Sequence, residues 1–140
     1  MQYFIDGLNF EEWNHNMRLY WNYFDQIKSK LPTQFVKIFQ SGDFHDSEIT
    51  SIIFSKFPTK KRNVYNITLS IENDEFKGEI VHQNVKKYTN SFVDISKYGC
   101  LCEYLYGEIL YENELWIHNI RFAQNNELSI CCKSINWVSL

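Results

Sequence analysis

The residues best suited to chemistry stand together in one stretch, Phe44-His45-Asp46-Ser47-Glu48. His45 could act as a base near neutral pH, and Asp46 or Glu48 could orient its ring or bind a metal ion. Asp and Ser are also turn formers, because their side chains bond to their own backbone. Neighbouring side chains on a strand point to opposite faces, so we expect His45 to face away from Asp46. The stretch is therefore either a structural turn or the centre of a catalytic or ligand site.

A second histidine, His118, lies in the stretch Trp116-Ile117-His118-Asn119-Ile120. Strand alternation places His118 on the same face as Trp116 and Ile120. If that face is the core, His118 is a buried, hydrogen-bonded histidine. If it lines a groove, Trp116 and His118 form a recognition pair, and with His45 and Asp46 they are our candidate binding residues.

Two other histidines, His15 and His82, stand alone in the sequence, and we expect both at the surface. The four cysteines form two close pairs, Cys100 with Cys102 and Cys131 with Cys132. Neither pair has the spacing of a zinc knuckle or of a C-x-x-C redox motif. We therefore expect free thiols, no metal and no cofactor.

Motifs of common enzyme classes are missing from the sequence. It has no G-x-S-x-G nucleophile elbow, no phosphate-binding glycine loop and no H-E-x-x-H motif. No nucleophile, base and oxyanion donor can be assembled from spacing. The sequence thus favours a protein that is not an enzyme.

One strong helix is expected near the start of the chain. Asn9 can cap it, with Glu12 as its capping-box partner, and Pro32 follows its end. Apolar residues recur at helical spacing from Trp13 to Leu31. Leu19 and Tyr23 widen this stripe, which either lies in a deep groove of the protein or forms a homodimer contact.

Strand patterns follow the helix, after an ambiguous segment at residues 35–39. The patterns cover residues 49–54, 64–71, 76–85, 103–110, 114–122 and 127–133. Residues 86–99 read as a long connection, with one short element at 92–95, and Trp137 as a packing anchor. No helices alternate with the strands, so a parallel sheet is disfavoured. We expect a single α+β domain over residues 1–140, with one long N-terminal helix packed on an antiparallel β-sheet of about six strands, a hairpin plus a C-terminal meander.

Charge and aromatic content bear on partners. The net charge of −3 and the pI near 5.8 disfavour nucleic acid and suit a basic protein partner. The densest positive run, Lys60-Lys61-Arg62, reads as a solvated loop. Aromatic residues make up 17% of the chain, including four Trp and nine Tyr. Because Trp and Tyr dominate binding hot spots, we expect an exposed aromatic patch rimmed by Asn and Glu.

The compartment is expected to be the cytoplasm. The first residues lack the features of a signal peptide, and no window of 18 apolar residues would span a membrane. Amino acids with A/T-rich codons are abundant, and Ala123 is the only alanine. This bias indicates a low-GC bacterial source.

The stretch FHDSEITSIIF, followed by a hairpin, a late meander and a terminal Trp, resembles small bacterial proteins of unknown function. Some of these are similar to immunity proteins of polymorphic toxin systems. The resemblance runs from Phe44 to Trp137, with His45-Asp46-Ser47 as its most distinctive step. It implies a cytosolic α+β protein that neutralises a toxin by binding and without catalysis. The acidic pI, taken separately, predicts that such a toxin is basic.

Two functions therefore remain open, besides a structural, self-assembling subunit that would use the wide apolar face of the helix. The first is a non-enzymatic, immunity-like protein that binds a protein partner. The alternative is a small metal-assisted hydrolase or ligand-binding protein centred on His45, Asp46 and Glu48.

Overall fold

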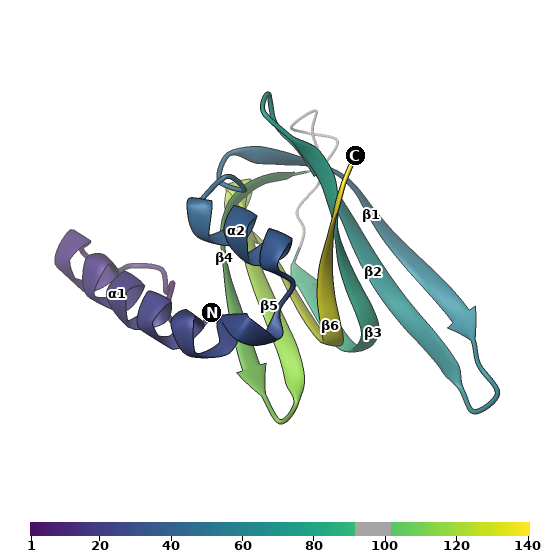
Figure 1. Cartoon of the computed structure of the whole chain (residues 1–140). Coiled ribbons are helices and arrows are strands. Elements are labelled where there is room, and N and C mark those ends of the chain that lie inside the picture. The colour runs from purple at the N-terminus through teal and green to yellow at the C-terminus, as the bar shows by residue number, and fades with distance from the viewer. Residues whose placement is uncertain (92–101) are drawn as a thin grey trace.

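The chain is α+β, as expected from its sequence, in a computed structural model that describes residues 1–91 and 102–140 (Figure 1). Two α-helices lie on one side of an antiparallel sheet. The helices and strands are α1 (Phe10–Ile27), α2 (Thr33–Ser41), β1 (Ser47–Pro58), β2 (Asn63–Glu72), β3 (Lys77–Ser91), β4 (Cys102–Glu112), β5 (Leu115–Phe122) and β6 (Asn126–Ser139). Short 3₁₀ turns, η1 (Lys28–Lys30) and η3 (Ala123–Asn125), follow α1 and β5.

The helix α1 begins where the capping signal predicts. The Asn9 side chain accepts a hydrogen bond from the Glu12 N–H at 2.9 Å, and its amide donates to the Glu12 carboxylate at 2.8 Å. These bonds satisfy one of the backbone donors that the first turn leaves unpaired. The face bearing Tyr20, Phe24 and Ile27 is buried.

The segment that was ambiguous in the sequence forms the helix α2. Phe35 and Phe39 are four residues apart and both buried, so the helix presents one apolar face to the core. Gly42 ends it in a left-handed conformation with φ of 80°. Glycine adopts this conformation without strain, which explains the sharp turn toward β1.

The sheet closes into a barrel with strand order β1-β2-β3-β6-β5-β4. The expected β2–β3 hairpin and β4–β5–β6 meander are confirmed. Several strands are longer than predicted: β3 continues to Ser91, and β6 runs to Ser139. The short element predicted at 92–95 lies outside the described residues.

Closure of the barrel rests on a short contact. Among the described residues, β1 pairs with β4 only where Ser47–Ile49 faces Cys102–Tyr104. Farther along β4, the edge that faces away from β5 meets α1. The Tyr20 hydroxyl accepts a hydrogen bond from the Ile109 N–H at 2.7 Å, and the Tyr23 hydroxyl accepts one from Tyr111 at 2.8 Å. The helix thus satisfies strand donors that would otherwise be buried without partners.

Tyr23, which widens the apolar stripe of α1, is therefore used within the protein, whereas Leu19 is exposed. The predicted packing anchor is also confirmed. Trp137 is buried against Phe44 and Phe76, and a Cβ at Gly78 would lie 2.2 Å from its ring. No helix in the described part of the chain has both the length and the apolar character of a membrane span.

The β1–β2 hairpin reaches beyond the rest of the barrel (Figure 1). Pairing of β2 with β3 ends at Ile67 and His82, whereas pairing of β1 with β2 continues to Pro58 and Asn63. We call residues 53–66 of this hairpin the arm. Its side chains have neighbours on fewer sides than those of the barrel.

Candidate functional site

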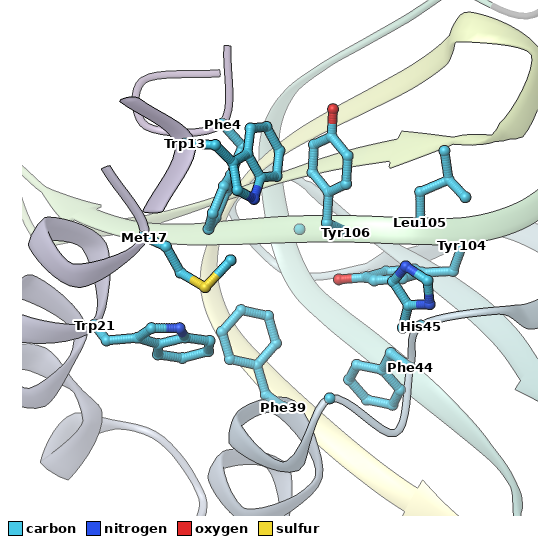
Figure 2. Close-up of a pocket in the computed structure, with 12 residues that line it drawn as sticks. Phe4, Trp13, Met17, Trp21, Phe39, Phe44, His45, Tyr104, Leu105 and Tyr106 are labelled. Carbon is cyan, nitrogen blue, oxygen red and sulfur yellow. The ribbon is translucent and has the colours of Figure 1, made fainter. Parts of the chain in front are cut away.

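A pocket of about 300 Å³ lies where α1, α2 and β4 meet, and we call it the aromatic pocket (Figure 2). Its lining is mostly apolar and comes from the N-terminal segment, both helices, the α2–β1 turn and β4. The lining residues are Phe4, Trp13, Met17, Trp21, Phe39, Gly42, Phe44, His45, Tyr104, Leu105, Tyr106 and Gly107. Many aromatic rings around few polar groups are typical of a small-molecule site.

Tyr104 supplies the one deeply buried polar group in this wall. Its side chain points toward the pocket interior in Figure 2, and the residue is 2% exposed. The hydroxyl has no hydrogen-bond partner among the described residues. Burial raises the pKa of Tyr104, so the hydroxyl stays protonated and able to donate. A Cβ at Gly107 would lie 2.1 Å from this oxygen, so the glycine makes room for it.

His45 lines the pocket from the turn that follows α2. Our expectation that it faces away from Asp46 is wrong, since His45 Nδ1 lies 3.0 Å from Asp46 Oδ2. The pair sits in a turn and not on a strand, and Asp46 has a φ of 62°. This left-handed conformation brings the two neighbouring side chains together, and both are largely exposed.

Glu48 does not join His45 and Asp46. It lies on β1 between the buried residues Ser47 and Ile49, so it points out of the barrel. Its partners in register are Glu72 and Glu103. Within residues 1–91 and 102–140, no group of three His, Cys, Asp or Glu side chains is arranged to hold a metal ion.

His118 is a buried, hydrogen-bonded histidine, which is the first of the two alternatives drawn from its sequence. Its partner is His82, whose predicted surface position is wrong because the residue is fully buried. His82 Nδ1 lies 3.1 Å from the Ile67 carbonyl, and His82 Nε2 lies 2.8 Å from His118 Nδ1. The carbonyl only accepts, so Nδ1 of each neutral ring is the donor. His118 Nε2 is then left as an acceptor, with no partner among the described residues.

Burial keeps both rings neutral. It lowers the pKa of His82 to about 4, and burial together with His82 places the pKa of His118 well below its ordinary value. Trp116 is buried on the same barrel face and packs on Tyr111, with ring centroids 4.6 Å apart. The groove alternative for Trp116 and His118 does not fit this burial. His15 is exposed, as expected.

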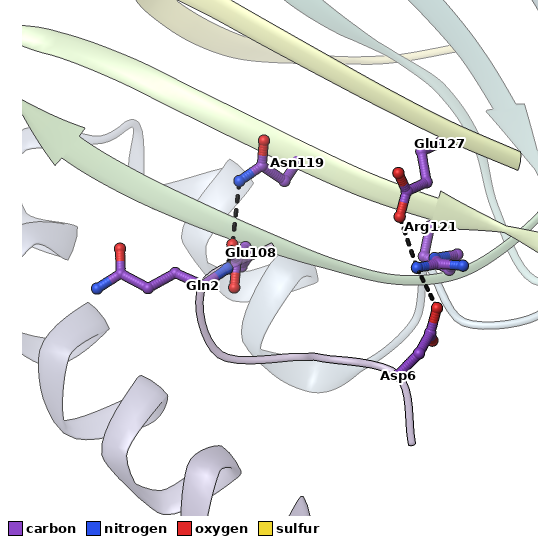
Figure 3. Close-up of polar contacts among 6 residues, drawn as sticks. All are labelled: Gln2, Asp6, Glu108, Asn119, Arg121 and Glu127. Atoms are coloured by element: carbon purple, nitrogen blue, oxygen red, sulfur yellow. Dashed lines mark hydrogen bonds and ion pairs between the residues drawn. The ribbon is translucent and has the colours of Figure 1, made fainter. Parts of the chain in front are cut away.

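The N-terminal segment is fixed to β4 and β5 by polar contacts (Figure 3). These contacts position Phe4, which lines the aromatic pocket. The backbone N–H groups of Gln2 and Tyr3 donate to the fully buried carboxylate of Glu108. Asn119 donates to the same carboxylate at 3.0 Å. A few residues along, Arg121 pairs with both Asp6 and Glu127.

A second candidate surface lies where the arm faces β3. Phe54, Tyr65 and Tyr88 are 56%, 49% and 47% exposed, and we call these three the arm patch. Phe54 and Tyr88 are in contact, with ring centroids 5.0 Å apart. Ile67 and Val85 lie beside them, in a hollow of about 250 Å³. The expected exposed aromatic patch is therefore present, on residues that the sequence did not single out.

The rim of the arm patch is basic and not, as expected, Asn and Glu. Lys86 and Lys87 line the hollow, and Lys56 lies opposite Tyr65 in register. Desolvation lowers the pKa of Lys86, and the nearby charges of Arg62 and Lys133 lower it further. No ion pair involves these five cations in the described part of the chain.

The arm is positively charged because it belongs to a segment that contains no Asp or Glu. Between residues 49 and 71 the chain carries Lys56, Lys60, Lys61 and Arg62 and no Asp or Glu. The net charge of −3 belongs to the whole chain, so the residues outside this segment are more acidic than that value indicates. The positive run that read as a solvated loop is one end of this basic surface.

Of the four cysteines, only Cys131 and Cys132 have described side chains, and these two add no site. Cys131 and Cys132 are free thiols, as expected, and burial raises the pKa of Cys132 to about 12, which makes it inert at neutral pH. Cys100 lies outside the described residues.

Comparison with known proteins finds no family model and no curated protein that matches the chain.

Proposed function

We propose that this chain is a non-enzymatic binding protein that engages an acidic surface of a protein partner through the arm patch. The observation that supports this most directly is the arrangement of Phe54, Tyr65 and Tyr88, which stand half exposed around a hollow rimmed by cations. Exposed aromatic rings around a cavity are typical of binding hot spots, because they gain large contact area at small entropic cost.

The hollow beside the arm patch fits an inserted side chain. Its volume of about 250 Å³ is enough for a large apolar residue of the partner. Lys56, Lys86 and Lys87 would then contact carboxylates around that residue. Such charge complementarity speeds association and selects the partner, while the apolar anchor supplies most of the affinity.

A protein fits this surface better than a nucleic acid. The remainder of the chain is acidic, and a phosphate backbone extending beyond the arm would be repelled. A compact acidic patch on a protein avoids that repulsion.

Toxin neutralisation is the specific form of this function that the resemblance implies. The arm patch would favour a toxin with an acidic docking surface, whereas the net charge alone had favoured a basic one. A basic toxin would dock on another face, where carboxylates such as Glu112 and Glu114 are exposed. The two cases differ in which substitutions abolish binding.

Capture of the partner tests the proposal. The tagged full chain is incubated at moderate salt with nuclease-treated extract of its native host, and bound proteins are identified by mass spectrometry. The same capture uses a Lys60→Glu/Lys61→Glu/Arg62→Glu variant. We expect a stoichiometric protein that binds the wild-type chain and is lost from the variant, because charge reversal repels an acidic surface.

The matched control is Phe10→Ala, which removes an exposed aromatic ring far from the arm in sequence. It should capture the partner as the wild-type chain does. A partner that binds wild type and the charge-reversed variant equally would contradict docking on the arm. Capture that is seen only with extract that has not been treated with nuclease would indicate nucleic acid in place of protein.

The metal-assisted hydrolase has less support. His45 and Asp46 pair with each other in an exposed turn, and Glu48 points away from them on β1. The other half of that alternative, a ligand-binding protein, has more support, because His45 borders the aromatic pocket.

A further inference from the structure

The aromatic pocket contains a buried donor that no part of the described protein uses. The Tyr104 hydroxyl is enclosed and lacks a partner among residues 1–91 and 102–140. Leaving such a group unpaired costs free energy, and a phenylalanine would fill the same space without that cost. Gly107 also gives up a side chain where the hydroxyl lies. The hydroxyl is therefore free to donate to an acceptor that is not among the described residues.

We propose that the aromatic pocket binds a compact, uncharged, ring-containing small molecule whose carbonyl or ether oxygen accepts a hydrogen bond from Tyr104. The binding site is separate from the arm patch and does not depend on the proposed protein partner.

The size and lining of the pocket define this class of ligand. A volume of about 300 Å³ suits one or two fused rings and is too small for a nucleotide or a folded peptide. Trp13, Trp21 and Phe39 supply ring faces and edges on three sides. Flat apolar molecules pack against such rings in stacked or edge-on geometry.

The residues that line the pocket also disfavour a charged ligand. No Lys or Arg lines the pocket, so an anion inside it would lose its hydration without compensation. An ammonium cation could pack on the aromatic rings, but it accepts no hydrogen bond and would leave the Tyr104 hydroxyl unpaired. His45, on the turn after α2, is the lining residue whose imidazole is largely exposed, and it can meet a polar substituent that extends toward solvent. The ligand is accordingly neutral within the pocket, with one acceptor deep inside and any further polar group at the mouth.

Two probes that share a ring skeleton test this inference. 1-Tetralone carries a carbonyl oxygen, and tetralin carries a methylene group in its place. Each is titrated into the full-length protein and followed by NMR, with the amide signals of Gly42 and Gly107 as reporters because both glycines line the pocket. We expect both probes to bind with dissociation constants below ~1 mM, and both glycine signals to shift.

The variant Tyr104→Phe isolates the hydrogen bond. It should weaken 1-tetralone about fivefold and leave tetralin unchanged, because only the ketone can accept from the hydroxyl. A Met17→Trp variant places an indole in the pocket wall and should abolish both titrations. Leu19→Trp adds the same indole at an exposed position of α1 and serves as its matched control.

The outcomes separate cleanly. The inference is supported if Tyr104→Phe weakens binding of 1-tetralone and leaves tetralin unchanged. Met17→Trp, but not Leu19→Trp, should also abolish binding of both probes. Equal 1-tetralone affinity in wild type and Tyr104→Phe overturns it, as does the failure of both probes to bind wild type. Binding that survives in a folded Met17→Trp protein overturns it as well, since the probes then lie elsewhere. If Met17→Trp does not fold, the Tyr104→Phe comparison decides alone.

Discussion

His82 and His118 share a hydrogen bond inside the barrel, with His82 Nε2 2.8 Å from His118 Nδ1. The bond joins β3 to β5, which are not neighbours in the sheet because β6 lies between them. His82 also bonds to the Ile67 carbonyl on β2. The two rings therefore link three strands through the core, and burial keeps both of them neutral.

This pair makes stability depend on pH. Burial lowers the pKa of both histidines in the folded protein, so the unfolded chain binds their protons first as the pH falls. Their contribution is fully present above about pH 6.5, the ordinary histidine value, and is lost as the pH falls toward about 4. Each site contributes a slope of up to about 1.4 kcal/mol per pH unit in that window.

Urea unfolding followed by tryptophan fluorescence between pH 5 and pH 8 measures this dependence. A His82→Gln/His118→Gln variant should lose much of the slope between pH 6.5 and pH 5, whatever its stability at pH 8. The slope is compared and not the absolute stability, because the variant also changes core packing. Equal slopes in the two proteins would show that the histidines do not titrate on unfolding.

Two buried tyrosines give opposite predictions for loss of a hydroxyl. Tyr20→Phe leaves the Ile109 N–H without its acceptor and should lower the free energy of unfolding by about 1–2 kcal/mol. Tyr104→Phe removes a hydroxyl with no partner among the described residues and should leave stability unchanged or raise it by about 1 kcal/mol. Chemical denaturation of both variants checks this. A large loss in Tyr104→Phe would mean that the hydroxyl is satisfied within the protein.

The carboxylate of Glu108 should decide whether the N-terminal segment stays bound. Glu108→Ala removes the acceptor for Gln2, Tyr3 and Asn119 and should lower the free energy of unfolding by about 3 kcal/mol. The first residues should also become sensitive to protease, because their backbone bonds are lost. Limited proteolysis with mass spectrometry reports this, and Glu112→Ala, exposed on the same strand, is the control. Equal protection in both variants would contradict this role.

The local pattern of the sequence predicted much of the fold. The Asn9 cap, the strand alternation around His118 and the late meander depend on residues close in sequence, where propensity and period act directly. The same alternation places His82 with the core residue Ile80. We had treated His82 as a lone residue and not as a member of its strand, which is why its position was predicted wrongly.

Local sequence patterns could not predict contacts between residues that are far apart in the chain. Within residues 1–91 and 102–140, barrel closure rests on three pairs between β1 and β4, which are distant in the chain, and no local signal marks these pairs. The aromatic pocket likewise joins Phe4, Trp13, Phe39 and Tyr104 from four separate segments. Of the predicted site residues, only His45 lines it.

Composition predicted the aromatic character of the arm patch correctly, but it predicted neither its position nor the basic residues around it. The aromatic excess predicted an exposed patch, but the net charge concealed the segregation of basic residues onto the arm. Lys86 and Arg62 are 24 positions apart in the sequence, and only the fold brings their charges together. Net charge averages over such a distribution and cannot reveal its sign at one surface.

The arm patch should contribute to binding and little to stability. Phe54→Ala/Tyr88→Ala removes two half-exposed rings, so we expect a change in the free energy of unfolding of about 1 kcal/mol or less. Thermal and chemical denaturation against the wild-type chain measure it. A loss of several kcal/mol would mean that the rings serve the fold and not a partner.

The affinity of the captured partner for Phe54→Ala/Tyr88→Ala tests the central claim most directly. Calorimetric titration compares this variant with the wild-type chain and with Phe10→Ala. We predict that the double variant loses at least about 2 kcal/mol of binding free energy, roughly 30-fold in affinity, whereas Phe10→Ala binds as wild type does. Unchanged affinity in a folded double variant would contradict the account, because the partner would then dock on a different surface.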